Sequence, residues 1–486
     1  MISVRNFTYT YRDAEGPVLD GINLEIHRGE FVVLSGPSGC GKSTLAMAIS
    51  GILFSQYDGE ASGEVLVTDQ NAAKVPVYET ADIVGLVQQN PESQFCTLRV
   101  EDEIVFGLEN RLLDRDQIEE RLNWSLAAVG LPGYRDRTLS TLSGGEKQKI
   151  ALAAILAARP EMIIFDEPTS NLDPPSTREV FEVILELQQE YDLTVLVIEH
   201  KLGFFDQIQP RRLEMIQGNI KEVNGKKEKI QIPSTPIPDP GKSRESSLLA
   251  VEDLSVGLNG LKILDRINFE IQPGEFVSLL GDNGSGKSTL LLSLLGLENG
   301  GSGRVVYRGK PLSKWAVAER GQEIGLVFQN PDHQIFAQTV WKEAVFAPEN
   351  FGLNPEIYMD STRSLLTWAG LGHRLEDHPY QLSFGEKRRL NLISMLASDP
   401  SLLLLDEIFI GQDPENALYI LELLQNFVRK GGSVIMVNHN PDYFSQVSTR
   451  VMFLESGKLV LDAPLKEGLV ELQRLGKTSY LPGWDL

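Results

Sequence analysis

The segment HRGEFVVLSGPSGCGKSTL (27–45) decides how this chain folds. A short apolar run, FVVLSG, leads into a glycine-rich loop, and an apolar helical pattern, TLAMAIS, follows the loop. The loop GPSGCGKS (36–43) matches the pattern G-x-x-x-x-G-K-[ST], in which curled backbone N–H groups surround phosphate groups. A strand, a phosphate loop and a helix in this order predict an α/β fold that binds a nucleotide.

The whole arrangement occurs twice along the chain. QPGEFVSLLGDNGSGKSTL (272–290) repeats the first segment, with GDNGSGKS (281–288) as its loop. Four further blocks repeat in the same order, namely 83–95 at 323–335, 141–149 at 381–389, 162–167 at 402–407 and 194–200 at 433–439. We therefore predict two copies of one domain, at 1–224 and 247–474. A Pro-, Ser- and Lys-rich linker is expected at 225–246, and we assign no function to the tail at 475–486.

Continuous apolar runs such as MIIFDE (162–167) and LLLLDE (402–407) are typical of strands buried on both faces of a parallel sheet. Helical patterns such as GEKQKIALAAILAA (145–158) separate these runs. The expected fold class is therefore α/β, with ligand sites at the carboxyl ends of the strands.

Composition excludes several classes of protein. The chain has 486 residues and a formal net charge of −22, and neither half is basic, which argues against nucleic acid as a partner. Its two cysteines, Cys40 and Cys96, are too few for a disulfide framework or a four-cysteine zinc site. The N-terminal sequence lacks a signal-peptide core, and the longest apolar runs are too short to span a bilayer. We expect a cytosolic chain that crosses no membrane itself but could dock on a protein that does.

The two loops supply the candidate nucleotide-binding residues. Lys42 and Lys287 are expected to reach the β- and γ-phosphates of ATP, and Ser43 and Ser288 to ligate Mg²⁺. The complete candidate set is Gly36, Pro37, Ser38, Gly39, Cys40, Gly41, Lys42, Ser43 and Thr44, with Gly281, Asp282, Asn283, Gly284, Ser285, Gly286, Lys287, Ser288 and Thr289.

Each of the later apolar runs ends in Asp-Glu. Asp166 and Asp406 suit a carboxylate that holds Mg²⁺, directly or through water. The next residues, Glu167 and Glu407, are placed to orient or polarise the attacking water. His200 and His439 end a following strand in both copies, and we expect them to contact the γ-phosphate.

With these residues the chain resembles the ATP-binding cassette (ABC) ATPases. The specific marker is LSGGE (142–146), between the phosphate loop and Asp166. The resemblance implies tandem P-loop domains, each with a mainly parallel β-core, an antiparallel subdomain and a helical subdomain. It implies that the two domains pair head to tail within the chain, so that each ATP lies between one phosphate loop and the opposite signature. It also assigns Tyr11 to stack on adenine, Gln89 and Gln329 to the metal, and a signature set to ATP: Ser143, Gly144, Gly145, Glu146, Ser383, Gly385 and Glu386.

Within this family the segments 90–110 and 330–350 resemble those of the energy-coupling factor (ECF) importers. Both contain N-P-x-x-Q followed by a V-F motif and a final Glu-Asn. This resemblance implies uptake of a vitamin, a vitamin precursor or a transition-metal ion such as cobalt or nickel. It implies two partners, an integral transmembrane coupling subunit and a membrane-embedded substrate-binding subunit, with the chain peripheral on the cytoplasmic face of the cell membrane. Four carboxylates, Glu101, Asp102, Glu103 and Glu109, could meet a cationic helix of the coupling subunit, or could simply form a solvated helix face.

Two alternatives resemble the sequence less. Tandem ABC proteins that act on the ribosome as translation factors have a long, charged, helical linker, whereas the segment between these copies is short and contains four prolines. Tandem ATPases of sugar importers typically have a degraded second phosphate loop, whereas Lys287 and Ser288 are intact.

The second copy departs from the first in three places. Its signature reads LSFGE, with Phe384 in place of a glycine, and its counterpart of Ser170–Asp173 reads IGQD (410–413). Leu258 occupies the position of Tyr11. Neutral drift is one explanation, and the other is that the two ATP sites are unequal, with the slower site at Lys42.

Overall fold

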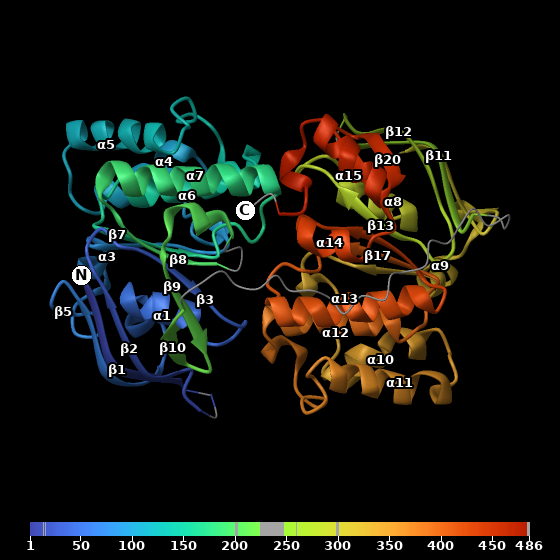
Figure 1. The fold of residues 1–486 in the computed structure, drawn as a ribbon, viewed down its shortest axis with the longest axis horizontal. Helices are drawn as coiled ribbons and strands as arrows, with labels where there is room; N and C mark the ends of the chain where they lie inside the picture. Colours follow the sequence, from blue (N-terminus) through green and yellow to red (C-terminus); the bar gives the residue numbers. More distant parts are fainter. Residues whose placement is uncertain are drawn as a thin grey trace. The chain divides into compact units, whose positions relative to one another are not determined.

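The computed structural model describes residues 1–12, 14, 16–199, 203–223, 247–258, 260–297 and 301–483. They form two compact units, which we call unit 1 (described up to residue 223) and unit 2 (described from residue 247) (Figure 1). The linker predicted at 225–246 lies outside the described residues. No helix in the described part of the chain is long and apolar enough to cross a lipid bilayer.

Unit 1 alternates strands and helices as the apolar runs predict. Its strands are β1 (Ile2–Tyr11), β2 (Leu19–Ile26), β3 (Phe31–Ser35), β4 (Gly59–Val67), β5 (Gln70–Asn71), β6 (Val84–Val87), β7 (Met162–Asp166), β8 (Thr194–Ile198), β9 (Arg211–Ile216) and β10 (Asn219–Glu222). Its α-helices are α1 (Lys42–Ile49), α2 (Ile52–Gln56), α3 (Val77–Ala81), α4 (Val100–Glu109), α5 (Arg115–Ala128), α6 (Gly144–Leu156) and α7 (Pro174–Tyr191).

Unit 2 repeats this order. Its strands are β11 (Leu249–Leu258), β12 (Leu261–Ile271), β13 (Phe276–Leu280), β14 (Ser302–Tyr307), β15 (Lys310–Pro311), β16 (Ile324–Val327), β17 (Leu402–Asp406), β18 (Ser433–Val437), β19 (Arg450–Glu455) and β20 (Lys458–Pro464). Its α-helices are α8 (Lys287–Leu295), α9 (Val317–Glu323), α10 (Val340–Asn350), α11 (Pro355–Trp368), α12 (Phe384–Leu396), α13 (Pro414–Arg429), α14 (Pro441–Val447) and α15 (Leu465–Arg474).

Each unit is built on a six-stranded and a four-stranded sheet. In unit 1 the larger sheet has the order β10-β9-β3-β8-β7-β6, and all its pairs except β9 with β10 are parallel. The smaller sheet, β2-β1-β4-β5, is antiparallel. Unit 2 has the matching orders β16-β17-β18-β13-β19-β20 and β12-β11-β14-β15. The predicted α/β class, with a mainly parallel core and an antiparallel subdomain in each copy, is confirmed.

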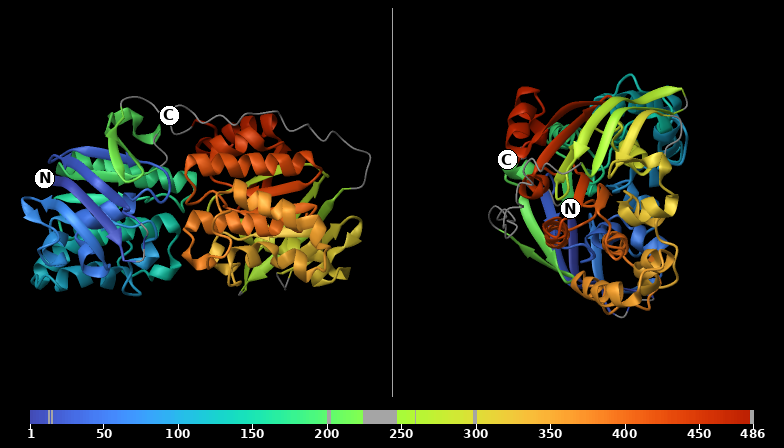
Figure 2. Two further views of the ribbon diagram at one scale, coloured as in Figure 1. Left: turned by 90° about the horizontal axis from the view of Figure 1, so that it is seen from below. Right: turned by 90° about the vertical axis from the view of Figure 1, so that its right-hand side faces the viewer.

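The central strands of the larger sheet in unit 1, β3, β7 and β8, are mainly apolar because both faces of the sheet are covered there. In unit 1, Val33 and Phe165 point to the face covered by α4–α7, whereas their neighbours Leu34 and Ile164 point to α1 and the antiparallel sheet. Successive side chains of a strand alternate between faces, so each strand contributes to two cores. The helices of the expected helical subdomain, α10–α12 in unit 2, have a small core of their own and lie at the opposite end of that unit from α15 (Figures 1 and 2).

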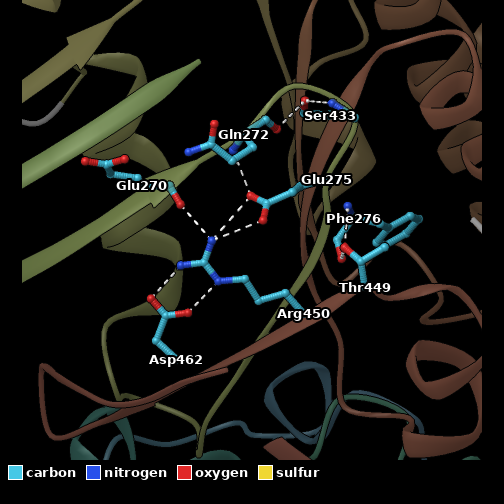
Figure 3. A network of polar contacts seen from close by, with 9 residues as sticks. Glu270, Gln272, Glu275, Phe276, Ser433, Thr449, Arg450 and Asp462 are labelled. Atoms are coloured by element: carbon cyan, nitrogen blue, oxygen red, sulfur yellow. Dashed lines mark hydrogen bonds and ion pairs between the residues drawn. The ribbon is translucent and has the colours of Figure 1, made fainter. Parts of the chain in front are cut away.

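An arginine joins the two sheets at the base of each unit. In unit 2, Arg450 at the start of β19 donates to the Glu270 carbonyl (2.8 Å) and pairs with Glu275 (3.3 Å) and Asp462 (2.5 Å), as Figure 3 shows. In unit 1, Arg211 at the start of β9 donates to the Glu25 carbonyl (2.7 Å) and pairs with Glu30 and Glu222. The same cation therefore fixes the same junction in both repeats.

Replacing Arg450 with methionine is expected to destabilise unit 2, because it leaves the buried carboxylate of Glu275 without its cation. Because the guanidinium is 19% exposed, we expect the free energy of unfolding to fall by about 2 kcal/mol, which is less than for a fully buried pair. For a unit of this size that corresponds to a fall of about 4–8 °C in the temperature of its calorimetric transition. Arg474→Met, which removes an exposed pair with Glu471, is the control and should leave the transition unchanged.

Candidate functional site

Both phosphate loops have the backbone shape that their glycines predict. Gly36 has φ 152°, and a β-carbon there would lie 2.2 Å from the carbonyl oxygen of Met215. Gly281 has φ 144°, and its β-carbon would lie 2.2 Å from the carbonyl oxygen of Leu454. Only glycine fits such a close approach at positive φ. Helices α1 and α8 begin directly at Lys42 and Lys287, so free N–H groups at each helix start face the loop.

The two lysines are buried and held by the loops themselves. Lys42 Nζ donates to the carbonyls of Gly36 (2.9 Å) and Pro37 (2.8 Å). Lys287 Nζ donates to the carbonyls of Gly281 (2.8 Å) and Asp282 (2.9 Å). Each ammonium group therefore lies inside its own loop, where an anionic phosphate would be bound.

Asp166 and Asp406 end β7 and β17 beside the loops. Burial raises the pKa of each carboxyl to about 6, although the Ser43 and Ser288 hydroxyls donate to them and oppose that shift. The Oδ1 atoms of Asp166 and Asp406 are buried and accept no hydrogen bond from the described protein. A buried, unsatisfied carboxylate oxygen next to a hydroxyl group is a donor set that suits a hard divalent cation.

The glutamates that follow have a strained backbone in both units. Glu167 has φ 46° and Glu407 has φ 51°, a left-handed conformation that is uncommon for residues other than glycine. In each unit the amide of the expected metal-binding glutamine donates to this carboxylate, Gln89 Nε2 at 3.0 Å and Gln329 Nε2 at 2.8 Å. Such strain at the same position of both repeats is typical of functional residues.

In unit 2 a histidine completes this arrangement. His439 Nε2 lies 2.7 Å from Glu407 Oε1. Burial alone would favour the neutral acid, but His439, Lys287 and Arg388 together hold the pKa of Glu407 below its usual range. Glu407 is therefore ionised and able to accept a proton. His200, the expected counterpart in unit 1, lies outside the described residues.

The expected adenine-stacking position differs between the units. Tyr11, the last residue of β1, has its hydroxyl 3.1 Å from the Thr44 hydroxyl of the first phosphate loop. Its ring makes an edge contact with Tyr57 at 5.9 Å. Leu258, the last residue of β11, is 37% exposed and pairs with Leu261.

The signature serines cap helices. Ser143 and Ser383 are the N-cap residues of α6 and α12, and each forms a capping box with the glutamate three residues later, Glu146 or Glu386. In unit 2 the Phe384 ring lies over the guanidinium of Arg388, with 4.8 Å between its centroid and Cζ. Arg388 in turn donates to the carbonyls of Gln329 and Glu407.

The acidic segment at 101–109 is largely not a free charged face. Glu103 is buried and accepts hydrogen bonds from the backbone N–H groups of Cys96 (3.0 Å) and Thr97 (2.9 Å). Glu101 pairs with Arg135. Glu343 has the same role as Glu103 in unit 2, accepting from Phe336 and Ala337. The suggestion that all four carboxylates of this segment face a partner is therefore wrong, because folding of the preceding loop uses Glu103.

The N-P-x-x-Q motif has a structural role in this loop. Asn90 and Asn330 accept from the backbone two residues on, and begin short 3-10 turns at Pro91–Ser93 and Pro331–His333. Gln94 accepts from the N–H of Gln88 at 2.9 Å and donates to the carbonyl of Leu86, and Gln334 does the same in unit 2. The motif thus fixes the chain next to Gln89 and Gln329.

Sequence reasoning missed two residues of unit 2 that contact its candidate site residues. Arg388 occupies the repeat position of Gln148, and this difference between the two copies could have drawn attention to Arg388. Tyr480, in the tail, donates to the side chain of Asp282 at 2.8 Å, and no local pattern marks it.

These loops, carboxylates and sheets define a P-loop nucleotide-binding protein with two such units. The ABC transporter family model matches residues 19–170 and 264–409. The chain therefore belongs to the ABC transporter family, as an ATP-binding and ATP-hydrolysing protein.

Several relatives match the chain over nearly its whole length. An ABC transporter ATP-binding protein of Methanosarcina mazei is 33% identical over 99% of this chain and 92% of its own. YkoD of Bacillus subtilis, named for HMP/thiamine import, is 36% identical over 95% of this chain and 91% of its own. The solved structure of cbiO1 from Clostridium perfringens, titled as part of the ABC transporter complex cbiONQ, is 31% identical and has a TM-score of 0.43. That match covers 48% of this chain and 95% of cbiO1.

Proposed function

We propose that the chain is the ATP-hydrolysing energy-coupling subunit of a prokaryotic ECF-type importer for a vitamin, a vitamin precursor or a transition-metal ion. The observation that carries this proposal is the likeness to YkoD over 95% of the chain, which includes both units. The name of that relative favours a thiamine-related substrate. The chain would lie on the cytoplasmic face of the membrane, bound to a transmembrane coupling subunit and a membrane-embedded substrate-binding subunit.

We assign the hydrolysis of ATP to the groups described above. Lys42 and Lys287 would bind the β- and γ-phosphates, and Glu167 and Glu407 would accept a proton from the water that attacks the γ-phosphorus. His439 would hold Glu407 ionised and oriented. Mg²⁺ would be held by Ser43, Gln89 and Asp166 in unit 1 and by Ser288, Gln329 and Asp406 in unit 2. Bound there, it would neutralise charge on the phosphate oxygens.

Exposed apolar side chains near the glutamine loops support membrane docking through a partner. Phe106 on α4 is 48% exposed, and Phe346 at the same repeat position on α10 is 41% exposed. Phe346 makes an edge contact with Phe336, which is 61% exposed, at 4.4 Å between ring centroids. Solvent-exposed aromatic side chains at matching positions of both units are suited to anchor a hydrophobic helix of another protein.

Replacing Phe106 and Phe346 together with glutamate is expected to reduce co-purification with the membrane subunits at least about tenfold, because each substitution puts a charge in a hydrophobic contact. The tagged chain would be purified from detergent-solubilised native membranes, and its integral partners and any bound small molecule identified by mass spectrometry. ATP binding should be unchanged, since neither residue contacts a phosphate loop.

Val470→Glu is the matched control, because Val470 is 62% exposed on α15. It should leave co-purification intact. Recovery of the parent chain with ribosomes and without integral membrane proteins would contradict the importer and favour a translation factor.

A further inference from the structure

The tail of the chain packs onto the second phosphate loop. Tyr480, in the 3-10 turn Thr478–Tyr480, is fully buried, and its ring meets Phe453 edge-on at 5.1 Å between centroids. Its hydroxyl donates to Asp282 Oδ1 at 2.8 Å. Asp282 is the second residue of the loop GDNGSGKS, so the tail reaches the loop directly.

Asp282 connects this contact to the phosphate-binding lysine. While its side chain accepts from Tyr480, its main-chain carbonyl accepts from Lys287 Nζ at 2.9 Å and from the N–H of Ser285 at 3.2 Å. A side chain that holds Asp282 in place therefore also holds the carbonyl that positions Lys287.

Two further contacts fix the tail itself. Lys477 lies 3.8 Å from Asp282 Oδ2 and pairs with Glu455. The N–H of Gly483 donates to Asp442 Oδ1 at 3.2 Å, in the first turn of α14, three residues after His439. The segment 477–483 thus connects the phosphate loop to the helix that follows His439.

The first phosphate loop cannot be held in this way. Its counterpart of Asp282 is Pro37, which has no polar side chain to accept a hydrogen bond. Any effect of the tail on nucleotide binding should therefore be confined to unit 2.

We propose that the segment 477–483 is a positioning element for the second phosphate loop. Tyr480 fixes Asp282 and thereby keeps the loop carbonyls and Lys287 in the arrangement that receives the phosphates of ATP. Ordering the loop in advance removes part of the entropy that binding would otherwise lose. The inference rests on the phosphate-binding role proposed for Lys287, and Tyr480 acts through Asp282 without touching the nucleotide.

The test uses the full chain with Lys42→Ala, so that ATP binds at unit 2 alone. In this background Tyr480→Phe keeps the ring packing and removes only the hydroxyl. We expect it to weaken binding of ATP in the presence of Mg²⁺ about tenfold, as for loss of a hydrogen bond to a charged group. Tyr307→Phe is the control, because Tyr307 is also a buried tyrosine that donates to a carboxylate, Glu323, at 3.0 Å. It should bind ATP like the background chain.

Asp282 variants distinguish positioning from general stability. Asp282→Asn keeps an oxygen acceptor for Tyr480 and should retain most of the affinity, whereas Asp282→Ala should lose about as much as Tyr480→Phe. The double variant should be no worse than Asp282→Ala alone, because that substitution already removes the hydrogen bond from Tyr480. Additive losses, or background-like binding by Tyr480→Phe, would overturn the positioning role. If Lys287→Ala also left binding intact, the assignment of the loop itself would be wrong.

Discussion

Replacing Lys42 and Lys287 together with alanine is expected to abolish ATP binding by the chain. Each lysine is only 5% exposed, and its ammonium group is held by two carbonyls of its own loop. The ammonium groups are thus already buried. A hydrogen bond to a charged group contributes about 1.5–3 kcal/mol. Either single substitution should therefore weaken binding at its own loop about 10–100-fold, and the double substitution should weaken both, so that neither site is filled at ATP concentrations that saturate the parent chain.

Calorimetric titration with ATP in the presence of Mg²⁺ measures both affinity and stoichiometry. The parent chain should bind two nucleotides, each single variant one with high affinity, and the double variant none. Lys262→Ala removes an exposed lysine that pairs with Asp265, and should bind ATP like the parent. Two parent-like sites in the double variant would exclude these loops as the nucleotide sites.

The fold was predictable because its determinants are local. Strands β3 and β17 each begin with four buried apolar residues, and a sheet covered on both faces accommodates such runs. Gly36 and Gly281 must be glycine for steric reasons that a loop motif expresses directly. Because the motif occurs twice and the same blocks follow it each time, the sequence predicts the same fold for the second unit.

The features that escaped prediction depend on tertiary contacts that no local pattern indicates. Tyr480 and Asp282 are 198 residues apart, and nothing near Tyr480 indicates a partner in a phosphate loop. Glu103 lies in an acidic run that is typical of a solvated helix, but it is buried by the loop that it hydrogen-bonds. The equivalent Glu343, in a copy without such an acidic run, was a usable signal that the position has a structural role.

The second large effect concerns the two catalytic glutamates. We expect Glu407→Gln to lower ATPase activity and transport by the full membrane complex at least about 100-fold, as for loss of a general base. Glu167→Gln should lower them by less than about fivefold, because we propose that the site at Lys42 contributes little turnover.

Among the contacts of Glu407, the one with Arg388 distinguishes it from Glu167. Its carboxylate accepts from Gln329 and contacts His439 at 2.7 Å, and its carbonyl accepts from Arg388. His439, Lys287 and Arg388 hold the pKa of Glu407 below its usual range. In unit 1 the position of Arg388 is occupied by Gln148, which carries no charge.

Phe384 gives an independent reason for the same asymmetry. We propose, from the family resemblance alone, that the LSFGE signature of unit 2 completes the site at Lys42 and that the intact LSGGE signature completes the site at Lys287. The Phe384 ring is 41% exposed and lies on Arg388 and against Gly411, so it occupies space that a glycine would leave open. Since loss of one correctly placed donor typically slows an enzyme about 10²–10³-fold, this bulk should slow the first site.

The substitution Phe384→Gly distinguishes the effect of the Phe384 ring from the effect of the contacts around Glu407. If the ring limits the site at Lys42, this substitution in a chain that also contains Glu407→Gln should restore ATPase activity at least about tenfold, since the donors can then approach the γ-phosphate. Thermal unfolding should be measured alongside, because the variant also removes the contact with Arg388. Equal losses for Glu167→Gln and Glu407→Gln, or a larger loss at Glu167, would show that the two sites share the work. In that case the bulk of Phe384 would have no kinetic consequence, and Arg388 would serve only to hold the loops of Gln329 and Glu407.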